Sequence, residues 1–269
     1  MRDNISSKKA EPPVWNTTWS KSHGKIQIGE MDIKIFNEIN KAIDITDKEV
    51  IELGCGRGVL SYLMLKYGAS KVTLVDFSKE ALSLARSLFK SHENVDFMLS
   101  NFFNVETTKT YDIVLSSGVA EHFSGELRKE GINKHLTLSK DIVLIIAPAR
   151  PHYNTVRHKK RRTIELYGWQ RAFSKKEIKA LIEETGEFKV ILNRRFYPLY
   201  GIDTYELLSF DTDAFIFKYW NFIIRLINAI LYKIKIYTLI DFILRPAANY
   251  CGGLLITVAV KNKNLEKKQ

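Results

Sequence analysis

The sequence predicts an α/β protein, built on a mostly parallel sheet of seven strands with helices on both faces. Between residues 30 and 200, short apolar runs of strand length alternate with segments whose apolar residues recur at helical spacing. A turn with three glycines, Gly54, Gly56 and Gly58, joins the first of these runs to a helical pattern. Parallel strands connected in this way end at one edge of the sheet, and ligands bind there.

The predicted elements follow one another in a regular order. Helices are expected over residues 31–43, 60–67, 78–92, 131–140 and 174–188, and strands over 50–53, 71–76, 95–103, 111–117, 141–150, 188–199 and 252–262. Ser78 and Ser174 stand where an N-cap hydroxyl begins a helix, and Gly186 lies where the last of these helices ends.

One domain with additions accounts for the whole pattern. Residues 30–200 and 251–263 form the domain, residues 1–29 form a polar and aromatic N-terminal arm, and residues 201–250 form an apolar helical insertion between the last two strands. No internal repeat and no linker divides the chain of 269 residues.

Composition narrows the classes of partner and compartment. A net charge of +11 favours an anionic partner, such as a phospholipid surface, a phosphorylated substrate or nucleic acid. Only two cysteines occur, Cys55 and Cys251, in no spacing that binds a metal, and the N-terminus shows no apolar signal segment. We therefore expect a cytoplasmic protein without a metal site.

The glycine turn indicates a nucleotide ligand, because bare backbone amides at a helix N-terminus attract negative charge. A dinucleotide fingerprint requires a third glycine where this chain has Val59, which argues against NAD. Asp76 ends the second strand about 20 residues after the turn, where a carboxylate can accept both hydroxyls of a ribose.

Four segments in this order resemble the motifs of a known family. They are "IELGCGRG", "LVDFS" with Asp76, "LSNFF" and "YDIVLSSGVAEHF". Together they resemble class I S-adenosylmethionine-dependent methyltransferases, in particular the small-molecule members of types 11 and 25. The resemblance covers roughly residues 35–197 and the final strand, and it implies a Rossmann-like sheet.

The same resemblance implies a set of site residues. Glu52, Gly54 and Gly56, with Gly58 closing the turn, would hold the methionine part of S-adenosylmethionine. Asp76 would bind the ribose. The resemblance places Phe77, Asn101 and Phe102 around the adenine, and Ser116 and Ser117 beneath the cofactor. Asn101 stands where the family often has Asp, and its carbonyl can accept the same hydrogen bond without the charge.

The catalytic residues implied are Glu121 and His122. Methyl transfer is a direct displacement that depends on alignment, and a base such as His122 is needed only for a weakly acidic acceptor. Residues Ser116-Ser117-Gly118-Val119 replace the proline-rich run of DNA amino-methyltransferases, and neither cysteine follows a proline. These absences argue against nucleic-acid acceptors without excluding RNA, and the apolar insertion favours a small, apolar or amphipathic acceptor. An RNA methyltransferase that uses the basic loop 157–162 and a cofactor-binding protein without catalysis stay as alternatives.

The role of the insertion stays open at this level. On a helix, Lys218, Asn221, Arg225 and Asn228 form one polar stripe, and the remaining face is apolar and aromatic. Interrupting charges argue against a membrane span, because a span needs about 20 mostly apolar residues. The segment would cap the pocket, form a homodimer contact, or lie on an anionic membrane surface as a peripheral element.

Overall fold

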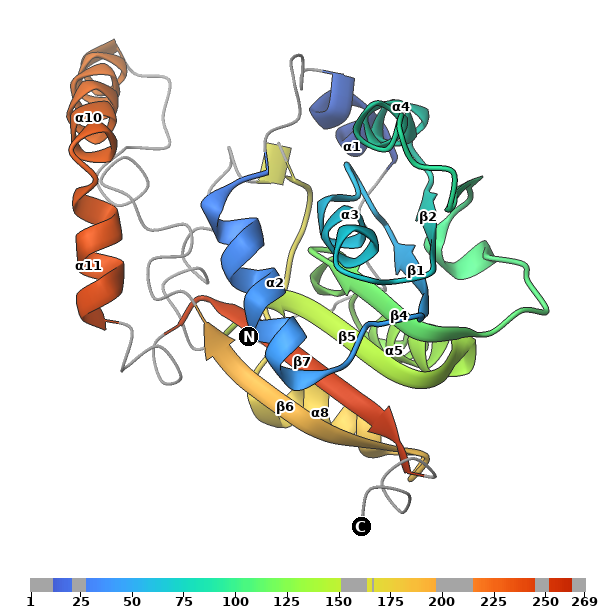
Figure 1. Cartoon of the computed structure of the whole chain (residues 1–269). Helices are drawn as coiled ribbons and strands as arrows, with labels where there is room; N and C mark the ends of the chain where they lie inside the picture. Colours follow the sequence, from blue (N-terminus) through green and yellow to red (C-terminus); the bar gives the residue numbers. More distant parts are fainter. Residues whose placement is uncertain are drawn as a thin grey trace.

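The computed structural model describes residues 12–20, 28–150, 164–165, 167–196, 215–244 and 252–262 (Figure 1). Seven strands form one sheet in the order β3-β2-β1-β4-β5-β7-β6. Their bounds are β1 Glu49–Leu53, β2 Lys71–Asp76, β3 Val95–Leu99, β4 Tyr111–Ser117, β5 Ser139–Pro148, β6 Phe188–Phe196 and β7 Leu254–Lys261. β1 to β5 pair in parallel, whereas β7 runs antiparallel to both β5 and β6. The predicted mostly parallel α/β sheet is confirmed.

Helices cover both faces of this sheet (Figure 1). Their bounds are α1 Pro12–Ser20, α2 Glu30–Ala42, α3 Val59–Lys66, α4 Lys79–Leu88, α5 Glu126–Leu138, α8 Lys175–Glu183, α10 Phe215–Lys233 and α11 Ile236–Leu244, with short 3-10 turns η1 Phe102–Asn104 and η2 Ala120–His122. One apolar cluster joins α2, α3 and α4 to the sheet, and a second joins α5 and α8 to it.

Side chains of β5 alternate between these two clusters, as a strand buried on both faces requires. Leu144 and Ile146 pack with α2 and α3, whereas Val143 and Ile145 pack with α5 and α8. The sheet is therefore buried on both sides, and a ligand reaches it at the edge where the parallel strands end.

Most predicted starts agree with the structure, and two caps are confirmed, but α4 and α8 end at Leu88 and Glu183, before their predicted ends at residues 92 and 188. Ser78 accepts a hydrogen bond from the Ala81 amide, and Ser174 accepts one from the Glu177 amide. The third strand ends four residues before its predicted end at residue 103, since the chain turns into η1 at Phe102. The fourth helix begins at Glu126 rather than at Gly131.

The N-terminal arm contains a helix that the sequence analysis did not predict. α1 begins at Pro12, has only a weak amphipathic pattern, and packs against α4 (Figure 1). Tertiary contacts therefore position this helix, since its own sequence offers little periodicity.

The insertion between β6 and β7 is helical, as predicted. α10 and α11 follow one another as a rod beside the sheet (Figure 1). Among the helices that the structure describes, none has the length and apolar character to cross a membrane. The basic loop 157–162 lies outside the described residues.

Candidate functional site

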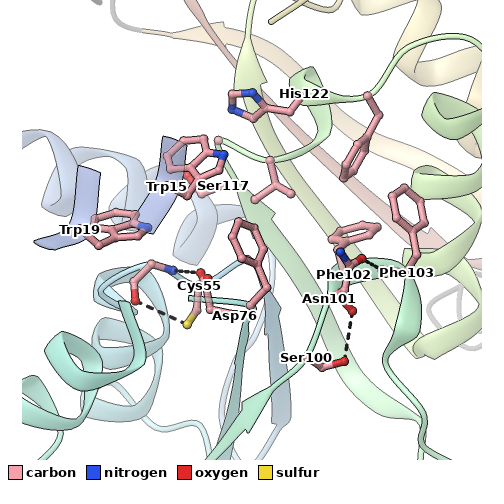
Figure 2. A pocket seen from close by; sticks show the side chains of 16 residues that line it. Trp15, Trp19, Cys55, Asp76, Ser100, Asn101, Phe102, Phe103, Ser117 and His122 are labelled. Carbon is pink, nitrogen blue, oxygen red and sulfur yellow. Dashed lines mark hydrogen bonds between the residues drawn. The ribbon is translucent and has the colours of Figure 1, made fainter. Parts of the chain in front are cut away.

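A pocket opens at the carboxyl ends of β1 to β4, where the fold places ligands (Figure 2). Its walls come from the ends of four strands and from α1. The lining residues are Trp15, Trp19, Gly54, Cys55, Gly56, Asp76, Phe77, Ser100, Asn101, Phe102, Phe103, Ser117, Gly118, Val119, His122 and Phe123. Eight of the predicted site residues thus line one cavity, seven of those expected to bind the cofactor and the predicted catalytic residue His122.

The glycine turn presents bare backbone to this pocket. Gly56 has φ +53°, and a Cβ there would lie 2.9 Å from two ring carbons of Trp19. At Gly54 a Cβ would lie 2.6 Å from the Val119 side chain. Only glycine satisfies the backbone angle and the close approach at both positions. Gly58 instead begins α3, facing Leu74 and Phe89 of the core.

Asp76 ties the turn to the end of β2. Its Oδ2 accepts a hydrogen bond from the Gly56 amide at 2.9 Å (Figure 2), and its Oδ1 accepts one from the Ser78 amide at 2.8 Å. Burial raises the pKa of this carboxyl, and the backbone hydrogen bonds oppose the increase. Each carboxylate oxygen keeps a further lone pair, so the group is able to accept ribose hydroxyls.

Asn101 and the phenylalanines near it form the opposite wall. The Asn101 Oδ1 accepts a hydrogen bond from the Phe103 amide at 3.0 Å and so caps η1. Its carbonyl oxygen has a second lone pair for a ligand. Phe77 and Phe102 supply apolar surface on which a planar base can stack. These donor and acceptor groups fit a nucleoside with an amino group and two hydroxyls.

Burial keeps His122 neutral. Its Nδ1 lies 2.9 Å from the carbonyl oxygen of Trp169, which accepts only, so Nδ1 carries the proton. Burial lowers the pKa of His122 to about 4, although backbone hydrogen bonds to Trp169 and Gly118 oppose this. The edge of its ring meets Trp15, with centroids 5.1 Å apart. Nε2 is therefore unprotonated at neutral pH and able to accept a proton, and a pKa of about 4 makes it a weak base in this structure.

Glu121 lies behind His122 and outside the pocket lining. Its carboxylate is buried, and Oε2 has no hydrogen-bond partner within the described part of the chain. Its Oε1 lies 4.0 Å from His122 Nε2. Burial raises the pKa of Glu121 to about 7, against the attraction of Arg128. This position suits a residue that acts through His122 better than one that touches a ligand.

Two further predicted residues are buried beside the pocket rather than lining it. Glu52 accepts a hydrogen bond from Ser61 Oγ at 2.6 Å, and burial raises its pKa to about 7. Ser116 lies 2.8 Å from Nε2 of the buried His135. The predicted contacts of Glu52 and Ser116 with the cofactor stay predictions, and in this structure both side chains bond to neighbouring helices.

Sequence analysis missed the two tryptophans of α1. Trp15 and Trp19 stack with ring centroids 6.2 Å apart, and both face the pocket (Figure 2). Their spacing of four residues would place them on one face of a helix, and that was the available signal. Cys55 also lines the pocket, and burial raises the pKa of its thiol, which leaves it a poor nucleophile.

Comparison with known proteins identifies the central part of the chain. Residues 50–140 match the model of a methyltransferase domain family. A ribosomal protein L11 methyltransferase of Shewanella sediminis is 34% identical over 88 residues, which are 33% of this chain and 29% of that protein. A mitochondrial ubiquinone biosynthesis O-methyltransferase of Dictyostelium discoideum is 33% identical over 106 residues, 34% of this chain and 33% of that protein. The chain thus spans about a third of the length of these relatives.

Solved structures extend the likeness over most of the chain. A magnesium protoporphyrin IX methyltransferase from Synechocystis with bound SAH has a TM-score of 0.56 at 14% identity, and 93% of each chain is covered. A mycolic acid cyclopropane synthase complexed with SAH and CTAB has a TM-score of 0.57 at 18% identity, covering 85% of this chain and 83% of that chain. At such identities the likeness establishes the fold.

Residues 50–140 therefore match a methyltransferase domain, and the predicted resemblance to class I S-adenosylmethionine-dependent methyltransferases is confirmed for this part of the chain. Both of these solved structures hold SAH, the product that S-adenosylmethionine leaves after it gives up its methyl group. The pocket described above contains the groups that this cofactor needs: bare glycine backbone, the Asp76 carboxylate and the Asn101 amide.

Proposed function

We propose that this protein transfers a methyl group from S-adenosylmethionine to a small, apolar or amphipathic acceptor. One observation carries the proposal. A single pocket combines the glycine turn and Asp76 with aromatic walls from Trp15, Trp19 and Phe123, and with neutral His122. Aromatic walls favour an apolar acceptor, since they bury its surface without offering it charged partners.

The chain's own residues would align the acceptor and remove its proton. Bound S-adenosylmethionine supplies a methyl group on a sulfonium, which makes that carbon electrophilic. His122 Nε2 would accept a proton from an acceptor hydroxyl or a similarly weak acid. The Trp169 carbonyl fixes the tautomer by holding the proton of Nδ1. Trp15 and Trp19 would exclude water from the acceptor, because they lie between the glycine turn and His122.

Transfer of label identifies the acceptor class. The full chain is incubated with methyl-labelled S-adenosylmethionine and cell extract, and products are partitioned between organic solvent, a nucleic-acid precipitate and a protein precipitate. We expect label in the organic-soluble, small-molecule fraction. Label in RNA would favour the alternative that uses the basic loop 157–162. Absence of label from every fraction, with intact cofactor binding, would support a binding protein without catalysis.

We also propose that the protein binds an anionic membrane surface through α10 and α11. Ten large apolar side chains of α10, α11 and the turn between them are exposed, by 42% to 65%. They are Tyr219, Trp220, Phe222, Leu226, Ile227, Ile230, Ile234, Leu239, Phe242 and Ile243. On α10 the half-buried positions include Asn221 and Asn228, and Ile224 is buried, so the apolar face is turned outward.

Charge favours lipid as the partner of this outward apolar face. Exposed Lys233 and Lys235 stand on either side of Ile234, which is 62% exposed. An interfacial helix has this arrangement, with apolar residues in the acyl boundary and cations near the headgroups. Each such cation contributes about 1 kcal/mol near an anionic bilayer, and the net charge of +11 adds a long-range attraction. Binding here would give a peripheral location for a cytoplasmic protein.

Vesicle sedimentation tests this surface. Wild type should sediment with vesicles of phosphatidylcholine and phosphatidylserine at low salt and dissociate as salt screens the charges. Replacement of Phe222, Leu226 and Ile230 by Ser should weaken sedimentation and leave cofactor affinity unchanged. A matched control replaces three exposed apolar residues of the domain, Ile33, Leu99 and Ile191, by Ser.

Two other outcomes would refute the membrane proposal. If wild type ignores the vesicles and the α10 variant changes from dimer to monomer, the face is a homodimer contact. If the α10 variant unfolds instead, the apolar face of α10 is part of the hydrophobic core.

A further inference from the structure

Three arginines surround one carboxylate beside the pocket. They are Arg128 of α5, Arg150 just beyond β5, and Arg171, and the carboxylate is that of Glu177 in the first turn of α8. Arg128 Nε and Arg171 Nη2 lie 3.0 and 3.2 Å from Glu177 Oε1. Arg150 Nη2 lies 2.6 Å from Oε2. Three guanidinium charges thus face one carboxylate, which leaves an excess of positive charge.

The three arginines differ in how fully their N–H groups are used in hydrogen bonds and ion pairs. Arg128 is 4% exposed, donates to the carbonyls of Phe123, Arg171 and Ala172, and stacks on the Phe173 ring. It is a structural residue. Arg150 and Arg171 have side chains that are 39% exposed, and each uses one terminal nitrogen on Glu177. Because a guanidinium has five donors, both retain N–H groups for another acceptor.

Backbone contacts connect this cluster to the catalytic side of the pocket. The Arg171 amide donates to the Glu121 carbonyl at 2.8 Å, and the Trp169 carbonyl holds His122. The Arg150 amide donates to the Phe173 carbonyl at 2.7 Å, so the backbone of Arg150 is bonded to segment 169–173. Arg150 follows β5 at the edge of the sheet where the parallel strands end, on the β5 side of His122.

We propose that Arg150 and Arg171 form a subsite for an oxyanion, a carboxylate or a phosphate, carried by the methyl acceptor. This inference rests on the proposed function, because the oxyanion belongs to the molecule that is methylated. Paired guanidinium forks bind such groups in a bidentate manner and fix their orientation. Glu177 holds the two forks side by side, and buried Arg128 anchors Glu177. The acceptor would then be amphipathic, with an apolar part among the tryptophans and an anionic part on the two arginines.

Glu121 does not cancel this charge. Its burial raises its pKa to about 7, so a substantial part of the population is protonated at neutral pH. Attraction by the arginines lowers the pKa of Glu177 and keeps it ionised, although burial opposes this. Electrostatic balance near Arg150 and Arg171 therefore favours an added anion.

Binding of simple anions tests the subsite without a known substrate. Inorganic phosphate and acetate are titrated into the full-length protein saturated with S-adenosylhomocysteine, and arginine side-chain N–H resonances are followed by NMR. We expect the resonances of Arg150 and Arg171 to shift. The anion that binds more tightly indicates whether the acceptor carries a phosphate or a carboxylate. Arg171→Gln should raise the dissociation constant at least tenfold, and Arg171→Lys should restore only part of the affinity because the fork is lost.

We expect the variants to keep the local fold, so that the test measures binding. Arg171 forms its backbone bonds through its own amide and carbonyl, which Gln retains. Arg86→Gln serves as the control, since Arg86 stacks on Phe97 far from the site, on the α4 side of the sheet, and its loss should leave the anion affinity unchanged. Unshifted resonances, or equal anion affinity in Arg171→Gln and wild type, would overturn the subsite.

Methyl labelling of cell extract distinguishes the subsite from the proposed function. The labelled product should bind an anion exchanger, and Arg171→Gln should reduce labelling at limiting extract about tenfold with unchanged cofactor affinity. A labelled product without negative charge would overturn the inference and leave the methyltransferase proposal intact. Arg171-dependent phosphate binding with no labelled product would retain the anion site and refute the proposed function alone.

Discussion

Replacing Gly56 by Ala tests whether bare backbone forms the cofactor wall. Gly56 has φ +53°, where an L-residue costs about 1–2 kcal/mol. For a chain of this size that cost lowers Tm by about 2–8 °C. The added Cβ would also lie 2.9 Å from Trp19, closer than real Cβ contacts, so the ring or the turn must move. Movement of the turn displaces the Gly56 amide from Asp76, and we expect S-adenosylmethionine affinity to fall at least tenfold.

A matched control separates the effect of backbone strain from the effect of disturbing the cofactor-binding wall. Gly186 has φ +71°, and no atom lies within 4 Å of a Cβ built there. Gly186→Ala should therefore lower Tm by a similar amount and leave the dissociation constant for S-adenosylmethionine unchanged in calorimetry. The double variant Gly56→Ala/Trp19→Leu removes the ring atoms that clash. Its stability should show a favourable coupling energy of about 0.5–3 kcal/mol.

Two results would refute this reasoning. An unchanged dissociation constant in folded Gly56→Ala would mean that the cofactor does not contact this turn. Equal losses of affinity in the Gly56 and Gly186 variants would assign the effect to general destabilisation.

Three further predictions concern charged and titratable groups. Asp76→Ala should weaken S-adenosylmethionine binding at least tenfold in calorimetry, because charge-assisted hydrogen bonds contribute about 1.5–3 kcal/mol each; an unchanged constant would move the ribose site elsewhere. His122→Ala should lower turnover about 10²–10⁴-fold with cofactor affinity nearly intact. The acidic limb that His122 sets in the pH profile of turnover should lie near pH 4, its pKa; this limb is the one that differs between wild type and His122→Ala, and finding it near 6.5 would contradict the buried geometry. Burial also lowers the pKa of His135 to about 4. The unfolded chain takes up this proton near pH 6.5 and the folded chain does not, so stability from His135 is complete above 6.5 and is lost toward pH 4, by about 3 kcal/mol in total. The free energy of unfolding of His135→Gln should therefore decline less between pH 7 and 5; opposing contributions from Glu52 and Glu121 are the same in both proteins and cancel in the difference. Parallel pH curves for the two proteins would contradict this.

Local sequence determined the sheet and the cofactor turn. Strand and helix periods, the caps at Ser78 and Ser174, and the glycine spacing each depend on neighbours within a few residues. Parallel strands joined by helices share one ligand edge, so Asp76 and Asn101 could be expected near the glycine turn before any coordinates. The prediction for Asp76 needed backbone preferences and chain order alone, whereas the prediction for Asn101 also needed the family resemblance.

Only the tertiary structure placed Trp15 and Trp19 in the pocket, since α1 has little periodicity of its own and is held by contacts with distant elements. The same holds for the arginine cluster, whose members come from α5, the end of β5 and segment 169–173. Burial set the charge states as well: His122 is neutral because it is desolvated, a property of the packed chain that no local pattern encodes. Local sequence determines those parts of the structure that depend on residues close to one another in the chain. Contacts between distant segments form only on folding, and so does the desolvation that they cause.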